Sequence, residues 1–124
     1  MYLLDSNVVI DFCNANLPDN TRKLLQKNEP QISVITRIEL FGSKKIPIKE
    51  RLKLEQFIEI STVYDTISIE IINHAIRIRQ EYRTDLPDAI IAATALAYNL
   101  ILISRNISDF KNIKGLQIID SYNL

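Results

Sequence analysis

The run Leu100-Ile101-Leu102-Ile103 constrains the fold of this chain more than any other segment, because every position in it is apolar. A strand with one solvated face alternates apolar and polar residues, whereas a parallel strand covered by helices on both faces is apolar throughout. The run therefore predicts a central parallel strand. It also predicts helices on both faces of the sheet, which is an α/β architecture.

Strand-like and helix-like patterns alternate along the rest of the chain. Besides 100–103, strands are predicted over residues 2–4, 32–35, 60–64 and 116–119. Helices are predicted over residues 8–14, 21–27, 36–41, 47–58, 68–82 and 87–97, with a short turn or helix at 107–110. This alternation indicates a mostly parallel sheet of about five strands with right-handed crossovers. Ligands of such sheets bind beyond the carboxyl ends of the strands.

The composition fits one globular domain over residues 1–124, since 47% of the residues are hydrophobic. Lys and Arg number 15 and Asp and Glu number 15, so the formal net charge is zero. Such a chain lacks the overall positive charge of a non-specific nucleic-acid binder. Contact with a phosphate backbone would therefore require a local basic patch or a metal ion.

Two features bear on where the protein resides. The single cysteine, Cys13, excludes an internal disulfide and fits a reducing compartment, so a cytoplasmic location is expected. The longest weakly charged stretch, residues 86–104, carries one charge, includes Pro87 and breaks near Asn99. It is interpreted as a buried helix followed by a strand, and no membrane contact is expected.

Four acidic residues lie beside apolar segments, where a carboxylate is costly unless something pairs with it. Asp5 ends the first strand, and Glu39 lies one turn into the helix after the second. Asp88 opens the helix that precedes the central strand, and Asp109 follows that strand. Because ligands of parallel sheets bind at the carboxyl edge, the four side chains are predicted to converge there.

A cluster of carboxylates is unstable by itself. Two of them about 4 Å apart repel by roughly 4 kcal/mol at an effective dielectric of about 20, so some take up protons or a cation neutralises them. Oxygen ligands without a nearby His or Cys favour Mg²⁺ or Mn²⁺ over Zn²⁺. The chemistry predicted for the cluster is metal-assisted phosphodiester hydrolysis.

Each acid also has a simpler local explanation. Glu39 completes the pattern Thr36-Arg37-Ile38-Glu39, which is typical of a capping box with Glu39 at the third helical position. Asp88 suits a helix N-terminus through the macrodipole. Asp5 and Asp109 suit turns or caps. Four unrelated local roles at one sheet edge explain the pattern less well than one shared site.

The acids lie within four motifs that resemble those of the PIN-domain family, and more narrowly those of VapC-type toxins. The motifs are Tyr2-Leu3-Leu4-Asp5-Ser6-Asn7-Val8-Val9-Ile10, Ile32-Ser33-Val34-Ile35-Thr36-Arg37-Ile38-Glu39-Leu40, Leu86-Pro87-Asp88-Ala89-Ile90-Ile91-Ala92-Ala93-Thr94-Ala95 and Leu102-Ile103-Ser104-Arg105-Asn106-Ile107-Ser108-Asp109-Phe110. The first motif is similar to the start of the family's domain, where a strand is followed by Asp, then Thr or Ser, then Asn. The other three are similar, in order, to the family's S-x-x-T-x-x-E-L segment, its P-D-x-x-I-A-A-x-A helix and its T-x-N-x-x-D-F ending. The matches come in the family's order and span almost the whole chain.

The resemblance implies a PIN-like three-layer α/β/α sandwich that acts as a metal-dependent endoribonuclease, the toxin of a toxin–antitoxin pair. It implies Mg²⁺ as the cofactor, with Mn²⁺ as a substitute. The implied catalytic and metal-binding set is Asp5, Glu39, Asp88 and Asp109. An RNA substrate, an antitoxin that blocks the site and a homodimer are implied as partners. The near-apolar helix at 89–97 and the Ile-rich helix at 68–82 are candidate dimer faces, and packing in the core is the alternative for both and the better explanation of the first.

Hydrogen-bonding support is implied for Ser6, Ser104 and Asn106. Ser104 stands where Thr is common in the family and keeps the hydroxyl. Position 106 is Asn where some relatives carry Asp, so Asp109 must serve as the fourth acid.

Three cations beside the fourth motif are candidates for binding RNA phosphates, and ordinary solvated surface explains them equally well. They are Arg105, Lys111 and Lys114. His74 is the only histidine, which excludes a two-histidine ribonuclease within one chain.

Two other functions stay open. A non-catalytic PIN-like module would retain the acids and act through protein contacts, and metal uptake would discriminate between it and the nuclease. A phosphotransfer domain would need an acceptor such as Asp65, but Asp5-Ser6 lacks the paired acids of a receiver. Asp85 lies near the predicted pocket and is the reserve candidate for Asp88.

Overall fold

The computed structural model describes residues 1–124, which form five strands, six α-helices and one 3-10 helix. The strands are β1 (Tyr2–Leu4), β2 (Gln31–Ser33), β3 (Thr62–Tyr64), β4 (Ile101–Ser104) and β5 (Ile118–Asp120). The helices are α1 (Ser6–Cys13), α2 (Asp19–Lys27), α3 (Val34–Phe41), α4 (Ile48–Glu59), α5 (Ile69–Glu81) and α6 (Leu86–Ala97), with η1 at Ile107–Asp109. No helix is both long enough and apolar enough to span a membrane.

The strands form one parallel sheet in the order β3-β2-β1-β4-β5. β1 lies at its centre, paired with β2 on one side and with β4 on the other. All five carboxyl ends therefore face the same edge. This arrangement confirms the predicted α/β fold with a parallel sheet of five strands.

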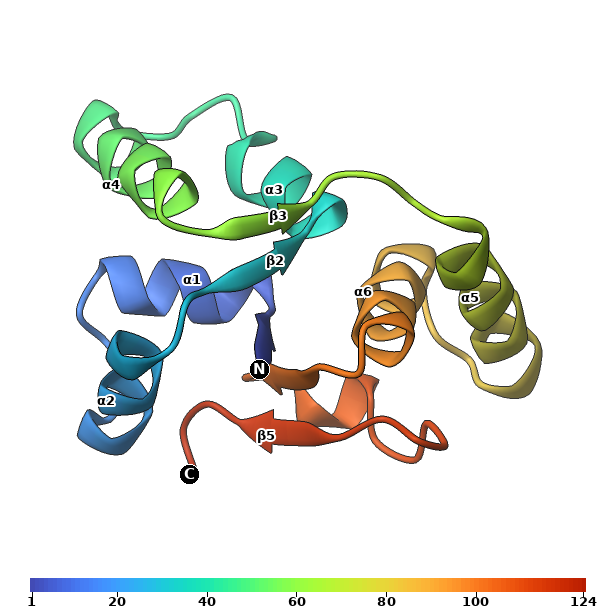
Figure 1. Ribbon diagram of the computed structural model, residues 1–124. Helices are drawn as coiled ribbons and strands as arrows, with labels where there is room; N and C mark the ends of the chain where they lie inside the picture. The colour runs from blue at the N-terminus through green and yellow to red at the C-terminus, as the bar shows by residue number, and fades with distance from the viewer.

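Two apolar clusters fill the space on the two faces of the sheet. Leu3 and Leu102 point to the face covered by α5 and α6, whereas Leu4 and Ile103 point to the face covered by α1, α2 and α4. Figure 1 shows these two helical layers on either side of the strands. Because neighbouring positions on β1 and β4 are both buried, these strands carry no polar face, as the apolar run at 100–103 predicted.

The boundary between β2 and α3 differs from the predicted one. Val34 and Ile35 begin the helix and do not extend the strand. The hydroxyl of Ser33 caps α3 by accepting a 3.2 Å hydrogen bond from the backbone N–H of Thr36. The capping-box explanation of Glu39 is therefore wrong, because Thr36 occupies the third helical position and Glu39 lies a turn further along.

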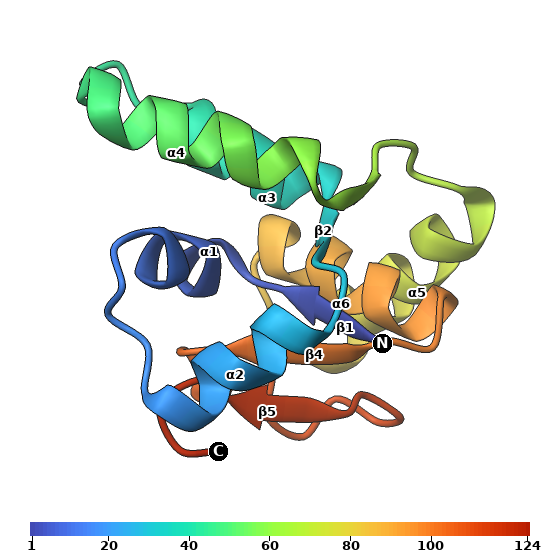
Figure 2. The same ribbon diagram turned by 60° about the vertical axis from the view of Figure 1, so that its left-hand side comes forward.

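Helices α3 and α4 form a hairpin that extends from the sheet, as Figure 2 shows. Leu40 of α3 and Leu54 and Phe57 of α4 anchor the hairpin in the apolar cluster on the α1 face. Lys44 and Lys45 lie in the connection between its two helices, at exposed positions. This connection and the first turn of α4 border a cavity that also reaches Ile10 of α1.

Candidate metal centre

Asp5 is the fixed centre of the candidate site. It follows β1 directly, caps α1 and is only 5% exposed. One carboxylate oxygen accepts a 2.9 Å hydrogen bond from the backbone N–H of Ser6, and the other accepts a 2.8 Å hydrogen bond from the hydroxyl of Ser104. The backbone N–H of Asn106 donates to that same hydroxyl oxygen at 3.0 Å. The carboxylate therefore has its orientation set from two neighbouring strand ends.

The predicted supporting residues thus contribute in different ways. Ser104 is fully buried at the end of β4 and contacts Asp5 with its side chain. Ser6 and Asn106 act through backbone N–H groups in these two bonds. Asn106 is exposed and directly precedes η1.

Asp88 lies in the first turn of α6, where Asp85 is the N-terminal capping position and Pro87 occupies the start of the helix. The pKa of Asp88 is raised to about 6, first by burial and then by the negative charges of Asp5, Asp109, Glu39 and Asp85. The charges that act on Asp88 include those of the other three predicted site acids. The fold thus brings all four into one electrostatic neighbourhood, although they come from four separate segments.

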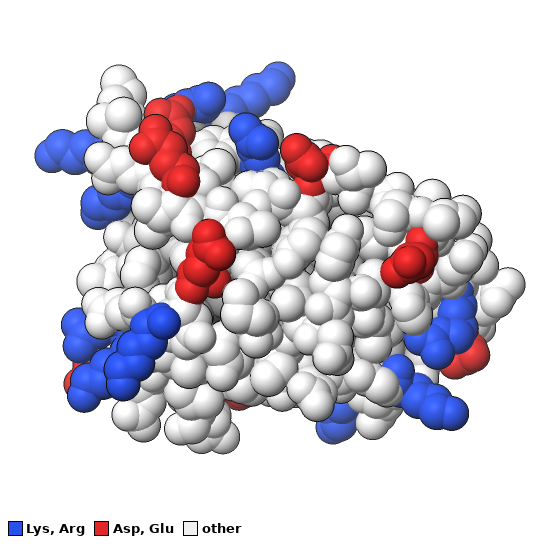
Figure 3. Space-filling view, in the orientation of Figure 1, with Lys and Arg blue, Asp and Glu red and all other residues white.

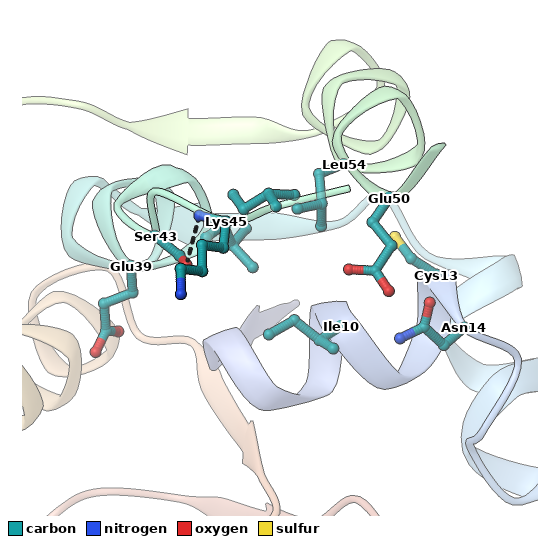
Figure 4. A pocket seen from close by; sticks show the side chains of 10 residues that line it. Ile10, Cys13, Asn14, Glu39, Ser43, Lys45, Glu50 and Leu54 are labelled. Carbon is teal, nitrogen blue, oxygen red and sulfur yellow. Dashed lines mark hydrogen bonds between the residues drawn. The ribbon is translucent and has the colours of Figure 1, made fainter. Parts of the chain in front are cut away.

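Glu39 projects from α3 at an exposed position. Its pKa is raised by burial and by the charge of Asp5, while a hydrogen bond with the Ser6 side chain acts in the opposite direction. Glu39 also lines a cavity of about 230 Å³ between α1 and the α3–α4 hairpin. In Figure 4 it lies at one end of this cavity, beside Lys45, with Glu50 and Asn14 at the other end.

Asp109 ends η1 and is exposed. Its charge contributes to the raised pKa of Asp88, so it belongs to the same neighbourhood. Unlike Asp5, it has no side-chain hydrogen bond that fixes its carboxylate. Of the four acids, Asp5 is held in place, Asp88 is partly buried, and Glu39 and Asp109 are exposed at the rim of the site.

The donor set of four carboxylates suits a hard cation such as Mg²⁺. In the conformations of this structure, however, no three His, Cys, Asp or Glu side chains are close enough together to hold a metal ion. The exposed Glu39 and Asp109 would have to rotate toward Asp5 and Asp88 to complete a coordination shell. The site is therefore a concentration of carboxylates around one rigid member, with exposed acids at its rim.

The three cations predicted to bind RNA differ in whether they already contact other side chains. Arg105 contacts the carboxylate of Asp11 at 3.3 Å and the hydroxyl of Tyr122 at 3.3 Å, and its pKa is raised first by the hydrogen bond with Tyr122 and then by Asp11. Lys111 and Lys114 are exposed and form no ion pair. Arg105 is therefore engaged within the protein, while the two lysines are available to solvent.

Asp11 is a buried acid that the sequence reasoning missed. It is 6% exposed and accepts a 2.7 Å hydrogen bond from the hydroxyl of Tyr122 as well as the bond from Arg105. Its spacing of three residues from Val8 was the available signal, because residues three apart share a helix face and Val8 belongs to the core. Asp11 ties α1 to the loop after β4 and to the segment after β5.

Comparison with known proteins places the chain in a family. The PIN domain family matches residues 2–116. A search of curated proteins gave no significant match. Among solved structures, a chain of a toxin–antitoxin complex from Klebsiella pneumoniae is 32% identical over 100% of both chains, with a TM-score of 0.77.

Two further solved structures have similar folds. A chain of VapBC2 from Rickettsia felis, bound to a DNA fragment from its promoter, is 29% identical with a TM-score of 0.78, covering 96% of this chain and 97% of that one. A chain of DNA-bound VapBC from Salmonella typhimurium is 28% identical with a TM-score of 0.78, covering 96% of each chain. Because the family match extends over nearly the whole chain and the fold agrees throughout, this protein belongs to the PIN-domain family.

Proposed function

We propose that this protein is a metal-dependent endoribonuclease and acts in the cytoplasm as the toxin of a VapBC-type toxin–antitoxin pair. The observation that carries the proposal is the gathering of Asp5, Glu39, Asp88 and Asp109 at the carboxyl edge of a PIN-domain sheet. Such a concentration of negative charge is costly in a bare protein, and after burial the neighbouring charges are the second cause of the raised pKa of Asp88. Binding of a divalent cation removes the cost.

The four acids have unequal parts in the proposed chemistry. The chemistry that Mg²⁺ or Mn²⁺ supplies when bound is Lewis-acid polarisation of the scissile phosphate and activation of the attacking water. Asp5, held by Ser104 and the Ser6 backbone, would provide the ligand whose position is set before the cation arrives. Asp88, whose pKa of about 6 leaves it mostly ionised at neutral pH, would provide a second carboxylate ligand, and Glu39 and Asp109 would close over the site from its rim.

The proposed partner is a protein antitoxin, since the similar solved chains belong to toxin–antitoxin complexes. The proposed assembly is a homodimer. Three exposed isoleucines of α5 support it, because they leave an apolar surface on the helix that was expected to supply the dimer face. They are Ile69, Ile72 and Ile76.

Cleavage of total cellular RNA by the purified protein tests the activity. The reaction is run with Mn²⁺, with Mg²⁺ and with a chelator, next to the Asp5→Asn variant. Cutting that requires metal and disappears in the variant is the expected result, and end-mapping of the fragments then identifies the substrate. Equal cutting by Asp5→Asn and wild type would refute the site assignment.

A second candidate function has one observation in its favour. No three acids are close enough together to hold a metal ion. The same arrangement of side chains is expected of a PIN-like module that binds no metal and acts only through protein contacts. Isothermal titration with Mn²⁺ separates the two functions. Binding that Asp5→Asn and Asp88→Asn weaken supports the nuclease, whereas a complete lack of Mn²⁺ binding supports the binding module.

A further inference from the structure

Half of the protein's lysines lie within ten residues. Lys44 and Lys45 are in the connection between α3 and α4, and Lys49 and Lys53 follow on α4. The segment 44–53 also holds Arg51 and a single acid, Glu50. In a chain whose formal net charge is zero, this is a strong local excess of positive charge.

The four lysines have no partner of opposite charge. Of the three salt bridges in the protein, only that of Arg51 with Glu55, at 3.1 Å, involves this segment. Arg51 and Glu55 are one helical turn apart and share a flank of α4, while Lys49 and Lys53 share another. Glu50 lies three residues before Lys53 but forms no salt bridge, so the acid beside the two lysines does not pair with them as Glu55 pairs with Arg51.

The lysine segment borders the acidic site. Lys45 and Glu39 line the same cavity, and Figure 4 shows them at the same end of it, to the left of Ile10 of α1. Glu50 and Leu54 of α4 line the cavity further along. The positive segment therefore continues directly from the rim of the carboxylate cluster along the hairpin.

We propose that Lys44, Lys45, Lys49 and Lys53 form a binding surface for the phosphate backbone of single-stranded RNA and guide the strand to the acidic edge. The inference rests on the proposed nuclease function and adds the surface that holds its substrate. A cluster of carboxylates repels a polyanion, so an enzyme with this site needs cations for the phosphates that flank the scissile one. Although the net charge of the chain is zero, the four lysines provide these cations in one place.

The chemistry of the surface fits a phosphate backbone. Arg recognises carboxylates and phosphates alike with fixed two-point geometry, but the one Arg of the segment is already bound to Glu55, so the lysines are the cations available to a ligand. Lysines act as point charges on flexible stems, which suits a chain of phosphates read without regard to base sequence.

The molecule has a second group of cations that provides a matched control. Arg22, Lys23 and Lys27 lie on α2 at exposed positions and do not line the cavity that holds Glu39. Figure 3 shows blue side chains over the α3–α4 hairpin at the upper left and over α2 at the lower left. Replacing three cations in either group changes the net charge equally.

The test measures RNA binding by the full chain carrying Asp5→Asn, which prevents cleavage, in chelator and over a range of salt concentrations. A fluorescent single-stranded RNA is the probe, followed by anisotropy. The test variant adds Lys45→Gln, Lys49→Gln and Lys53→Gln. The control variant instead adds Arg22→Gln, Lys23→Gln and Lys27→Gln. All six positions are exposed, and equal melting temperatures verify that both variants fold.

The test variant should bind RNA roughly a hundredfold more weakly at about 0.1 M salt. The slope of the logarithm of its association constant against the logarithm of the salt concentration should be smaller in magnitude by about 2. The control should stay within a few-fold of its parent. An equal loss in both variants overturns the inference, because it assigns binding to net charge. Displacement of the RNA by poly-glutamate at equal charge concentration also overturns it and points to an acidic protein as the ligand.

Failure of this inference is distinguishable from failure of the proposed function. The three lysine substitutions are also placed in the active chain and assayed for metal-dependent RNA cleavage. Cleavage with unchanged KM would overturn the lysine surface and leave the nuclease intact. If RNA binding requires the lysines but the wild type cleaves no RNA with any metal, the proposed nuclease function is refuted and the lysine surface is not. An absence of RNA binding by the parent overturns the lysine surface directly.

Discussion

The hydroxyl of Ser104 donates a 2.8 Å hydrogen bond to the carboxylate of Asp5, joining residues that are 99 positions apart. The two residues lie at the carboxyl ends of the neighbouring strands β4 and β1, whose pairing is extended by a 3.0 Å bond from the backbone N–H of Asp5 to the carbonyl of Ile103. Both are buried, so water is a poor substitute for either partner. The register of two strands therefore fixes the one acid on which the candidate site is centred.

Loss of that hydroxyl should weaken both the fold and the site. Ser104→Ala leaves a buried carboxylate short of one partner, which costs about 1.5–3 kcal/mol in the free energy of unfolding. Urea denaturation in chelator measures this cost, and the rate of metal-dependent RNA cleavage should fall with it. Ser104→Thr keeps the hydroxyl and should recover most of both quantities. An Ala variant as stable and as active as the wild type would refute the positioning role.

The contacts of Asp11 with Arg105 and Tyr122 predict that removing either partner lowers the stability of the fold. Tyr122→Phe removes one hydrogen bond to the buried carboxylate and should cost about 1 kcal/mol of unfolding free energy. Arg105→Ala removes the only cation beside Asp11 and should cost more, roughly 2 kcal/mol because the pair is partly solvated. Guanidinium denaturation of both single variants and the double variant gives the coupling. Strictly additive effects would contradict a shared network.

The sequence predicted the layout of the sheet because the signals for it are local. An all-apolar run at 100–103 identifies β4, which spans Ile101–Ser104, without any knowledge of its neighbours. The boundary at β2 was wrong for the same reason: Val34 and Ile35 are β-branched and apolar, so periodicity alone assigns them to the strand. The cap formed by Ser33 decides in favour of the helix, and this cap is a contact that periodicity does not detect.

The candidate site was predictable only as far as topology determines it. Strand ends at one edge bring Asp5, Glu39 and Asp109 together, whatever their side chains do. The spacing of Asp11 from Val8 was a local signal of its buried position, but its partners Arg105 and Tyr122 are 94 and 111 positions away, so no local pattern reveals the contacts that pair it. Glu39 and Asp109 are exposed, so no packing pattern in the sequence determines the orientations of their side chains.

The raised pKa of Asp88 predicts how stability depends on pH in chelator. An acid whose folded pKa lies above its unfolded value binds protons more tightly when folded, so stability falls as pH rises between them. The window runs from the ordinary value of 3.8 to about 6. The loss should be about 1 kcal/mol once solvent screening of this partly exposed group is allowed for. Asp88→Asn should lack this fall and be the more stable protein at pH 7.

The measurement is urea denaturation of both proteins from pH 4 to pH 7, with chelator present throughout. Glu70→Gln on α5 is a suitable control, because Glu70 does not contribute to the raised pKa of Asp88 and the fall should persist in this variant. The same stability at pH 7 in Asp88→Asn and wild type would show that burial and the neighbouring carboxylates disfavour the ionised form of Asp88 less than its raised pKa implies.

Metal binding should reverse the cost that the clustered acids impose. With Mn²⁺ at 100 times its dissociation constant, the free energy of unfolding should rise by about 2.7 kcal/mol, since the cation binds the folded chain alone. The melting temperature should rise accordingly, and the rise should shrink in Asp5→Asn, where the rigid ligand loses its charge. In Asp88→Asn the gain at the same Mn²⁺ concentration should also be smaller, because the cation has one charged ligand fewer and less repulsion to relieve, and both weaken its binding. A melting temperature that millimolar Mn²⁺ leaves unchanged in the wild type would mean that the acids hold no cation, and the binding-module function would then be the better explanation of this fold.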